Sequence, residues 1–127
     1  MKKLAVVALA LVIAMSFVGC GLANQLVGTK WENKVIGDYY GYDVTATHSL
    51  EFKEDNKVVE IYSIWANDLA YEVDGGTYTG TWTVDGEELT LKYDGYVAEV
   101  YTAVIDGDKL ILTDKADSTK EEFTRVK

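Results

Sequence analysis

Polar and apolar side chains alternate along most of the chain, with a period of two residues. The segment 77–84 shows the pattern best: its threonines share one face, and the opposite face carries Tyr78, Gly80, Trp82 and Val84. Strict alternation over eight residues predicts a β-strand with one buried face. A second alternating run, 89–93, follows Asp-Gly at 85–86. Two such runs joined through Asp-Gly predict a β-hairpin.

The same pattern recurs between short polar turns and predicts eight strands. Their expected ranges are 26–35, 47–53, 57–65, 77–84, 89–93, 96–105, 109–113 and 120–126. Sequential strands with short connections predict an all-β fold, an eight-stranded antiparallel up-and-down meander. Because closure removes both edges of such a sheet, we expect a closed or nearly closed barrel. A two-sheet β-sandwich is the alternative.

Large side chains are expected to point into this barrel. They are Phe52, Trp65, Tyr78, Trp82, Leu89, Leu91, Tyr93, Leu110, Leu112 and Phe123. Eight strands enclose a space that is either filled by side chains or large enough for one small ligand. The sequence leaves both possibilities open.

The first twenty residues differ from the rest. Two lysines follow Met1, and the run 4–18 is apolar except for Ser16 and ends shortly before Cys20. A basic start followed by a short apolar run is typical of a secretory signal, and the run is short for a membrane span. Cys20 is the only cysteine, which leaves no partner for an intramolecular disulfide.

The segment 17–21, Phe-Val-Gly-Cys-Gly, resembles the lipobox of bacterial lipoproteins. The resemblance implies a signal peptide over 1–19, lipid on Cys20, a short linker over 20–25 and a domain over 26–127. The domain would then lie outside the cytoplasm, held by its lipid in the cell membrane or outer membrane. A retained membrane helix and a conventional signal cleaved elsewhere are the alternatives.

Charge narrows the choice of partner. The formal net charge is −9, and without Lys2 and Lys3 ten basic residues face 21 acidic ones, a net charge of −11. Nucleic-acid binding needs clustered Lys and Arg, so we do not expect this protein to bind nucleic acid. We expect a monomer with the membrane as its partner through Cys20.

Short motifs at three places carry a family resemblance. They are Gly28-Thr29-Lys30-Trp31, Gly80-Thr81-Trp82 and Phe123-Thr124-Arg125. Together they resemble the small lipocalin-like domains of bacterial lipoproteins. In lipocalins a Trp of a Gly-x-Trp motif packs against an Arg near the end of the barrel. The resemblance implies this role for Trp31 and Arg125, although the spacing here is Gly-x-x-Trp.

Meander order places alternate connections at the same end of the barrel. One end would have the tight turns 54–57, 85–88 and 106–108, and the other the connections 36–46, 66–76, 94–95 and 114–118. The second set is rich in tyrosine, and binding residues often lie on loops above a rigid scaffold. We therefore expect a small apolar ligand to bind at that end. The expected binding residues are Tyr39, Tyr40, Tyr42, Trp65, Tyr71, Tyr78, Trp82 and Tyr96.

Two other interpretations of the tyrosines remain. The rings could simply cap the barrel, or the protein could be a protein- or glycan-interaction module, or an envelope-structural one, with a filled core. Enzymatic chemistry and a cofactor are not expected, because His48 is the only histidine and no phosphate loop is present. No metal site is expected either, since zinc needs several His or Cys ligands. An enzyme would require His48 in a cleft beside a carboxylate.

Overall fold

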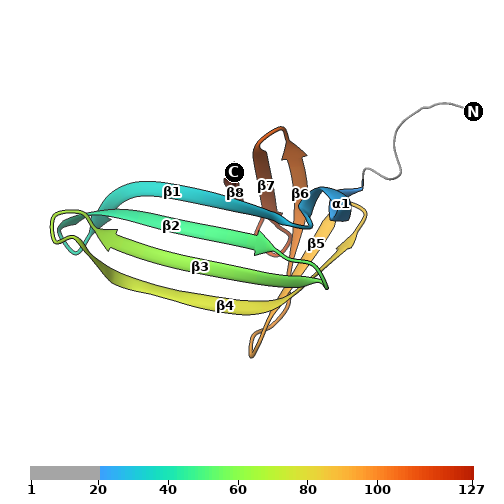
Figure 1. The fold of residues 1–127 in the computed structure, drawn as a ribbon, viewed down its shortest axis with the longest axis horizontal. Coiled ribbons are helices and arrows are strands. Elements are labelled where there is room, and N and C mark those ends of the chain that lie inside the picture. Colours follow the sequence, from blue (N-terminus) through green and yellow to red (C-terminus); the bar gives the residue numbers. More distant parts are fainter. Residues whose placement is uncertain (1–20) are drawn as a thin grey trace, which may run out of the picture.

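A computed structural model describes residues 21–127, which form a short helix and a closed barrel of eight antiparallel strands in chain order (Figure 1). The elements are α1 (Leu22–Leu26), β1 (Thr29–Tyr39), β2 (Tyr42–Phe52), β3 (Lys57–Ala66), β4 (Tyr71–Asp85), β5 (Glu88–Tyr93), β6 (Glu99–Asp106), β7 (Lys109–Asp114) and β8 (Lys120–Val126). The barrel and its meander order are confirmed, and the two-sheet alternative is wrong. The expected signal peptide and Cys20 lie outside the described residues.

The barrel closes where β1 pairs with β8, through Lys30–Val126, Trp31–Arg125 and Glu32–Thr124. The Arg125 guanidinium lies 4.6 Å from the centre of the Trp31 ring, and Trp31 is fully buried. The contact implied by the lipocalin resemblance is therefore present. A guanidinium over an indole contributes about 0.5–2 kcal/mol, depending on its desolvation.

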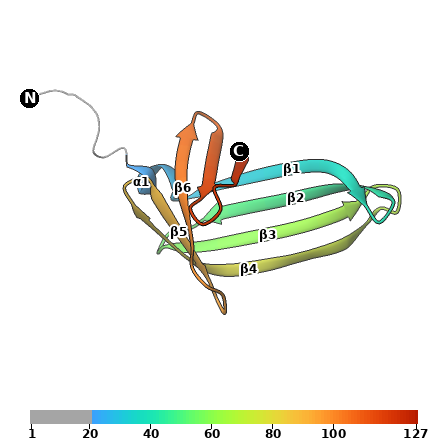
Figure 2. The ribbon, with the colours of Figure 1, turned by 180° about the vertical axis from the view of Figure 1, so that it is seen from behind.

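The strands differ in length, and this difference shapes the molecule. β1 to β4 contain 10–15 residues each, whereas β5 to β8 contain 6–8. The first four strands therefore project beyond the others as a four-stranded sheet, whose turns lie at the end opposite α1 (Figures 1 and 2). We call the projecting part, residues 35–46 and 62–76, the extended sheet.

The expected loops over 36–46 and 66–76 are a wrong prediction. The chain turns only at Tyr40-Gly41 and over 67–70, because β1 and β2 pair as far as Tyr39–Tyr42. Tyr40 and Gly41 both have positive φ, 50° and 87°, as a two-residue hairpin turn requires. Polar and glycine residues inside these strands, such as Gly37 and Asp38, made the segments resemble loops.

Below the extended sheet, buried apolar side chains pack together inside the barrel. They form one cluster: Leu26, Trp31, Leu50, Phe52, Val58, Trp82, Leu89, Leu91, Tyr93, Ala103, Leu110, Leu112 and Phe123. Leu26, which we expected to begin the first strand, belongs to α1. Gly28, at a φ of 79°, redirects the chain from this helix into β1. All eight strands, the pairing that closes the barrel and this core lie within residues 21–127, so this part of the chain contains a complete closed barrel.

Trp65 and Tyr78 do not join this core, although the alternation suggested that both would. Trp65 faces outward because β3 turns its even-numbered residues inward, and Ile64 and Ala66 are buried on either side of it. Tyr78 faces inward but lies above the core, where its ring is exposed. The other large residues expected inside are buried.

A second, smaller cluster lies on the inner face of the extended sheet. Val44, Ile64 and Ala66 are buried there, with Tyr39 and Val73 packed against them. The Tyr39 hydroxyl donates a hydrogen bond to Asp74 Oδ2 at 3.3 Å, from β1 to β4. Because two strands separate β1 from β4, the extended sheet curls over its own inner face. The inner face between the two clusters remains accessible.

Candidate functional site

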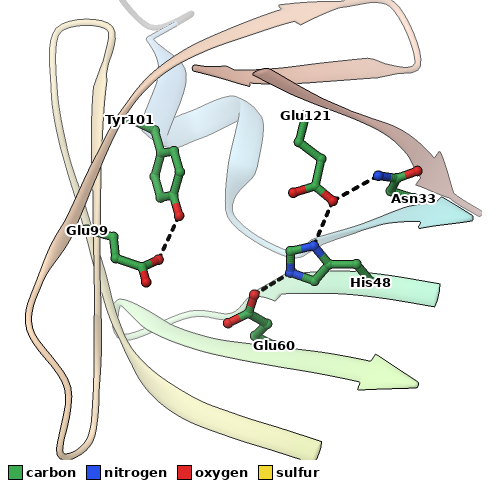
Figure 3. A network of polar contacts seen from close by, with 6 residues as sticks. All are labelled: Asn33, His48, Glu60, Glu99, Tyr101 and Glu121. Carbon is green, nitrogen blue, oxygen red and sulfur yellow. Dashed lines mark hydrogen bonds and ion pairs between the residues drawn. The ribbon is translucent and has the colours of Figure 1, made fainter. Parts of the chain in front are cut away.

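A polar network lies at the level where the closed barrel meets the extended sheet. Its members point inward from four strands: Asn33 on β1, His48 on β2, Glu60 on β3 and Glu121 on β8 (Figure 3). Strand register brings them together, since Asn33 pairs with His48 across β1 and β2. Each occupies an inner-face position where alternation alone would place an apolar residue. Because burying polar groups costs free energy, several inward polar side chains at one level are more typical of a functional site than of a layer of the apolar core.

His48 is held between two carboxylates. Its Nδ1 lies 2.8 Å from Glu121 Oε2, and its Nε2 contacts Glu60 Oε2. Burial alone would lower the His48 pKa, but the hydrogen bonds to Glu121 and Glu60 outweigh it and raise the pKa to about 9. The ring is therefore an imidazolium at neutral pH, and both of its N–H groups donate to carboxylates.

Glu121 is the best-connected acid of this network. Asn33 Nδ2 donates a second hydrogen bond to Glu121 Oε2 at 2.8 Å. Burial opposes ionisation of this carboxyl, but the bonds from His48 and Asn33 outweigh that effect and lower its pKa. With one imidazolium between two glutamates, the network has a formal charge of −1.

His48 therefore meets the geometric condition set for a catalytic histidine, because it lies beside carboxylates at the edge of a pocket. Its protonation state opposes that role. A general base needs an unprotonated ring nitrogen, and at a pKa of about 9 both nitrogens of His48 carry protons at neutral pH. The arrangement matches an ion-paired structural cation.

A second polar group lies across the interior on β6. Tyr101 donates a hydrogen bond to Glu99 Oε1 at 2.6 Å (Figure 3). Beside it, Tyr93 is only 4% exposed, and its hydroxyl has no hydrogen-bond partner of acceptable geometry among the described residues. Burial, and after it the nearby Glu60 charge, raises the Tyr93 pKa, so this hydroxyl stays protonated. A buried hydroxyl without a partner costs about 1–3 kcal/mol.

Two pockets open at this level. The first, about 320 Å³, we call the histidine pocket; it is lined by Asn33, Val35, Ala46, Thr47, His48, Tyr62 and Glu121. The second, about 160 Å³, we call the tyrosine pocket; it is lined by Glu60, Tyr78, Tyr93, Tyr96 and Glu99. Because Glu60 of the tyrosine pocket contacts His48 of the histidine pocket, the two are neighbours across one ion pair.

The residues expected to bind a ligand are distributed over four places. Tyr78 and Tyr96 line the tyrosine pocket, with ring centres 5.7 Å apart. Tyr39, Tyr40, Tyr42 and Tyr71 lie at the far end of the extended sheet. Trp82 is buried in the core, where its ring packs 5.5 Å from Phe52, and Trp65 faces outward. Neither tryptophan lines either pocket, so the geometry gives neither a place in this site.

The sequence interpretation did not select Glu60, Tyr62, Tyr93, Glu99 or Glu121 as site residues. The signal was present in the parity of the strands: Glu60 and Tyr62 share the inner face with Val58, and Glu121 shares it with Phe123. Inward carboxylates are the signal that could have found the site.

Two further features are absent from residues 21–127. No group of three or more His, Cys, Asp or Glu side chains is arranged to hold a metal ion there. Within the same residues, no helix has the length and apolar character needed to cross a bilayer.

Comparison with known proteins identifies the family. A model of the lipocalin-like domain matches residues 26–112, which is more than half of the chain and extends from the end of α1 into β7. No curated protein and no solved structure matches the chain. Taken with the closed eight-stranded barrel, the match shows that this chain belongs to the lipocalin-like domain family.

Proposed function

We propose that this protein is a lipid-anchored binding protein that holds a small ligand with an apolar body at the open end of its barrel. Lipocalin-like domains are generally binding proteins, which supports a binding role in the coarse sense. The finer proposal rests on the division of the interior into a filled half and an open half.

One observation carries the proposal. Val35 and Tyr62 face the barrel axis, yet 54% and 41% of their surfaces are exposed. Inward apolar side chains of a filled barrel would be buried, as they are one layer below. Ligand sites are typically concave, largely apolar and supplied with a few polar groups that fix orientation. The histidine pocket has this composition, with Val35, Ala46 and Tyr62 beside Asn33, His48 and Glu121.

The anchor completes the proposed arrangement. Cys20 directly precedes Gly21 and α1, and α1 packs at the closed end of the barrel, away from the turns of the extended sheet (Figure 1). Lipid on Cys20 would hold that end near the bilayer and turn the open end away from it. Two acyl chains anchor a protein stably where one does not. Intact-mass measurement of the full chain from membranes should show the diacylglyceryl addition, and Cys20→Ala should remove it.

The binding proposal is tested with an uncharged apolar probe, N-phenyl-1-naphthylamine, whose fluorescence rises in apolar surroundings. The test variant is Tyr62→Ser, and the matched control is Ile61→Ser. Ile61 is the next residue on β3 and is 39% exposed, but it faces outward. Loss of an apolar ring contact of about 1–1.5 kcal/mol should weaken binding to Tyr62→Ser roughly tenfold. Binding to Ile61→Ser should match the native protein.

The opposite pattern would favour a second function. Ile36, Thr45 and Trp65 lie in one row across the outer face of β1 to β3, and Ile36 and Trp65 are exposed. An exposed apolar row of this kind suits a protein or glycan partner. If the probe binds the native protein but not Ile61→Ser, or does not bind at all, the small-ligand proposal is contradicted. The outer face would then be the surface to test for a partner.

A further inference from the structure

We propose that the tyrosine pocket binds the primary ammonium group of the ligand, so that the protein selects amines with an apolar body. The inference rests on the proposed function and deepens it, because it names the chemical class that the open end takes. It is carried by three features of the pocket: uncompensated acidic charge, an unpartnered buried hydroxyl and a cluster of aromatic rings.

The acidic charge at this pocket is only partly neutralised by the described residues. Within residues 21–127, no Lys or Arg forms a salt bridge with Glu60, Glu99 or Glu121. His48 compensates one of the two glutamates that contact it, which leaves one negative charge, and Glu99 adds another. The molecule as a whole carries a net charge of −9, which raises the local concentration of cations.

The Tyr93 hydroxyl is the independent sign of a missing partner. It is buried and has no partner of its own among the described residues, although it lines the same pocket as Glu60 and Glu99. Burial, then Glu60 through its charge and a side-chain interaction, and after these the charge of Glu99, raise the Tyr93 pKa, so the hydroxyl lies near both acids although no well-formed hydrogen bond joins it to either. A donor that enters the pocket could bond to the carboxylates and to this oxygen together.

Aromatic faces complete the pocket. The Tyr78 ring centre lies 6.4 Å from that of Tyr93 and 5.7 Å from that of Tyr96, both in edge-to-face geometry. These three rings line the pocket, and an aromatic face attracts a cation within about 6 Å. The volume of about 160 Å³ suits a head group, with the apolar body extending toward the histidine pocket.

Hydrogen-bond capacity distinguishes a primary ammonium from other cations. An R–NH₃⁺ group has three donors, which matches two carboxylates and one hydroxyl oxygen. A quaternary ammonium has no donor for Tyr93. A bare metal ion would require a ligand cluster of a kind that residues 21–127 do not contain.

The test uses residues 21–127, labelled with ¹⁵N, and compares phenethylammonium chloride with 2-phenylethanol at pH 7. The two compounds share their aromatic body and differ in the charged group. Backbone amide shifts report both the affinity and the place of binding. A single charge-assisted interaction predicts that the ammonium compound binds at least about tenfold more tightly. Its largest shifts should fall on the amides of Glu60, Tyr78 and Glu99.

Three variants separate the site from general electrostatics. Glu99→Gln should weaken binding of the ammonium compound about tenfold and leave 2-phenylethanol unchanged. Glu122→Gln removes the same unit of charge from an exposed residue on the outer face of β8, and it should have little effect. Tyr93→Phe should weaken ammonium binding several-fold, while the free protein becomes no less stable, since an unsatisfied buried hydroxyl has been removed.

Each outcome has a distinct meaning. Equal binding of the two compounds at the open end overturns the ammonium proposal and leaves the proposed binding function standing. Equal loss in Glu99→Gln and Glu122→Gln also overturns it, because the effect would be one of net charge. If neither compound binds while N-phenyl-1-naphthylamine does, only the ammonium proposal fails. If no probe of any charge perturbs the open end, both proposals fail.

Discussion

At His48, burial and hydrogen bonding act in opposite directions, and the outcome decides the chemistry of the barrel interior. Partial burial favours the neutral ring, but two carboxylates accept hydrogen bonds from its two nitrogens. The carboxylates prevail because each would itself be a poorly compensated buried charge without the imidazolium. His48 thus allows two glutamates, one on β3 and one on β8, to lie inside the barrel.

The His48 pKa predicts how stability depends on pH. Its value in the native protein, about 9, exceeds the ordinary 6.5, so its contribution is fully present below pH 6.5 and is lost as pH rises toward 9. The lowered Glu121 pKa acts in the other direction, since its contribution is lost as the solution becomes acidic. The stability that the protonated His48 contributes, and that is lost as pH rises above 6.5, is on the order of 3 kcal/mol.

This prediction is checked by urea unfolding at pH 6 and pH 9, together with an NMR titration of the His48 ring. With one histidine in the chain, its ring signals need no assignment by mutation. Unfolding should require less urea at pH 9, and the ring should titrate near pH 9. Glu121→Gln should bring the titration closer to pH 6.5. Equal stability at the two pH values, with a ring that titrates at 6.5 in the native protein, would show that the ion pairs do not form.

Among the single elements, β4 has two roles: its first part belongs to the extended sheet, and its last part pairs with β5 in the closed barrel. It turns from one role to the other near Gly80, which pairs with Val58 on β3 and Tyr93 on β5. A Cβ at Gly80 would lie 2.1 Å from the Lys92 carbonyl oxygen and 2.7 Å from Tyr93 Cα. Both neighbours are backbone atoms, so β5 could not yield without loss of its pairing.

We therefore expect Gly80→Ala to destabilise the domain by about 1–3 kcal/mol in urea unfolding. Gly37→Ala is the matched control, since Gly37 also lies within a strand but a Cβ there meets nothing within 4 Å. Removing its backbone freedom should leave stability unchanged or raise it by up to about 1 kcal/mol. Similar losses in both variants would indicate that glycine is needed for flexibility in these strands and not for the close approach at Gly80.

Element order and strand number could be predicted from the sequence because alternation and turn residues are local signals. The ends of β1 to β4 could not, because Gly37, Asp38 and Gly75 resemble a loop until the partner strand supplies their hydrogen bonds. The helix α1 is five residues long, too short for a periodic signal. A local sequence pattern also could not identify the acids that contact His48, since Glu121 lies 73 residues away in the chain.

In the molecule as a whole, the two halves of the barrel differ in their packing and in their inward charge. The closed half is packed by a single apolar cluster and carries the Trp31–Arg125 contact that seals the seam. The open half has a smaller cluster, two pockets and most of the inward charge. The family match ends at residue 112, before β8, yet β8 supplies Glu121 to the site and Phe123 to the core.

The proposed function depends on a small ligand binding on the inner face of the extended sheet. The most direct test is to measure nuclear Overhauser contacts between bound N-phenyl-1-naphthylamine and the isotope-labelled domain. We expect contacts to the methyl groups of Val35 and Ala46 and to the ring of Tyr62, which line the histidine pocket. Contacts to Ile36 and Trp65 on the outer face, with none inside, would contradict it.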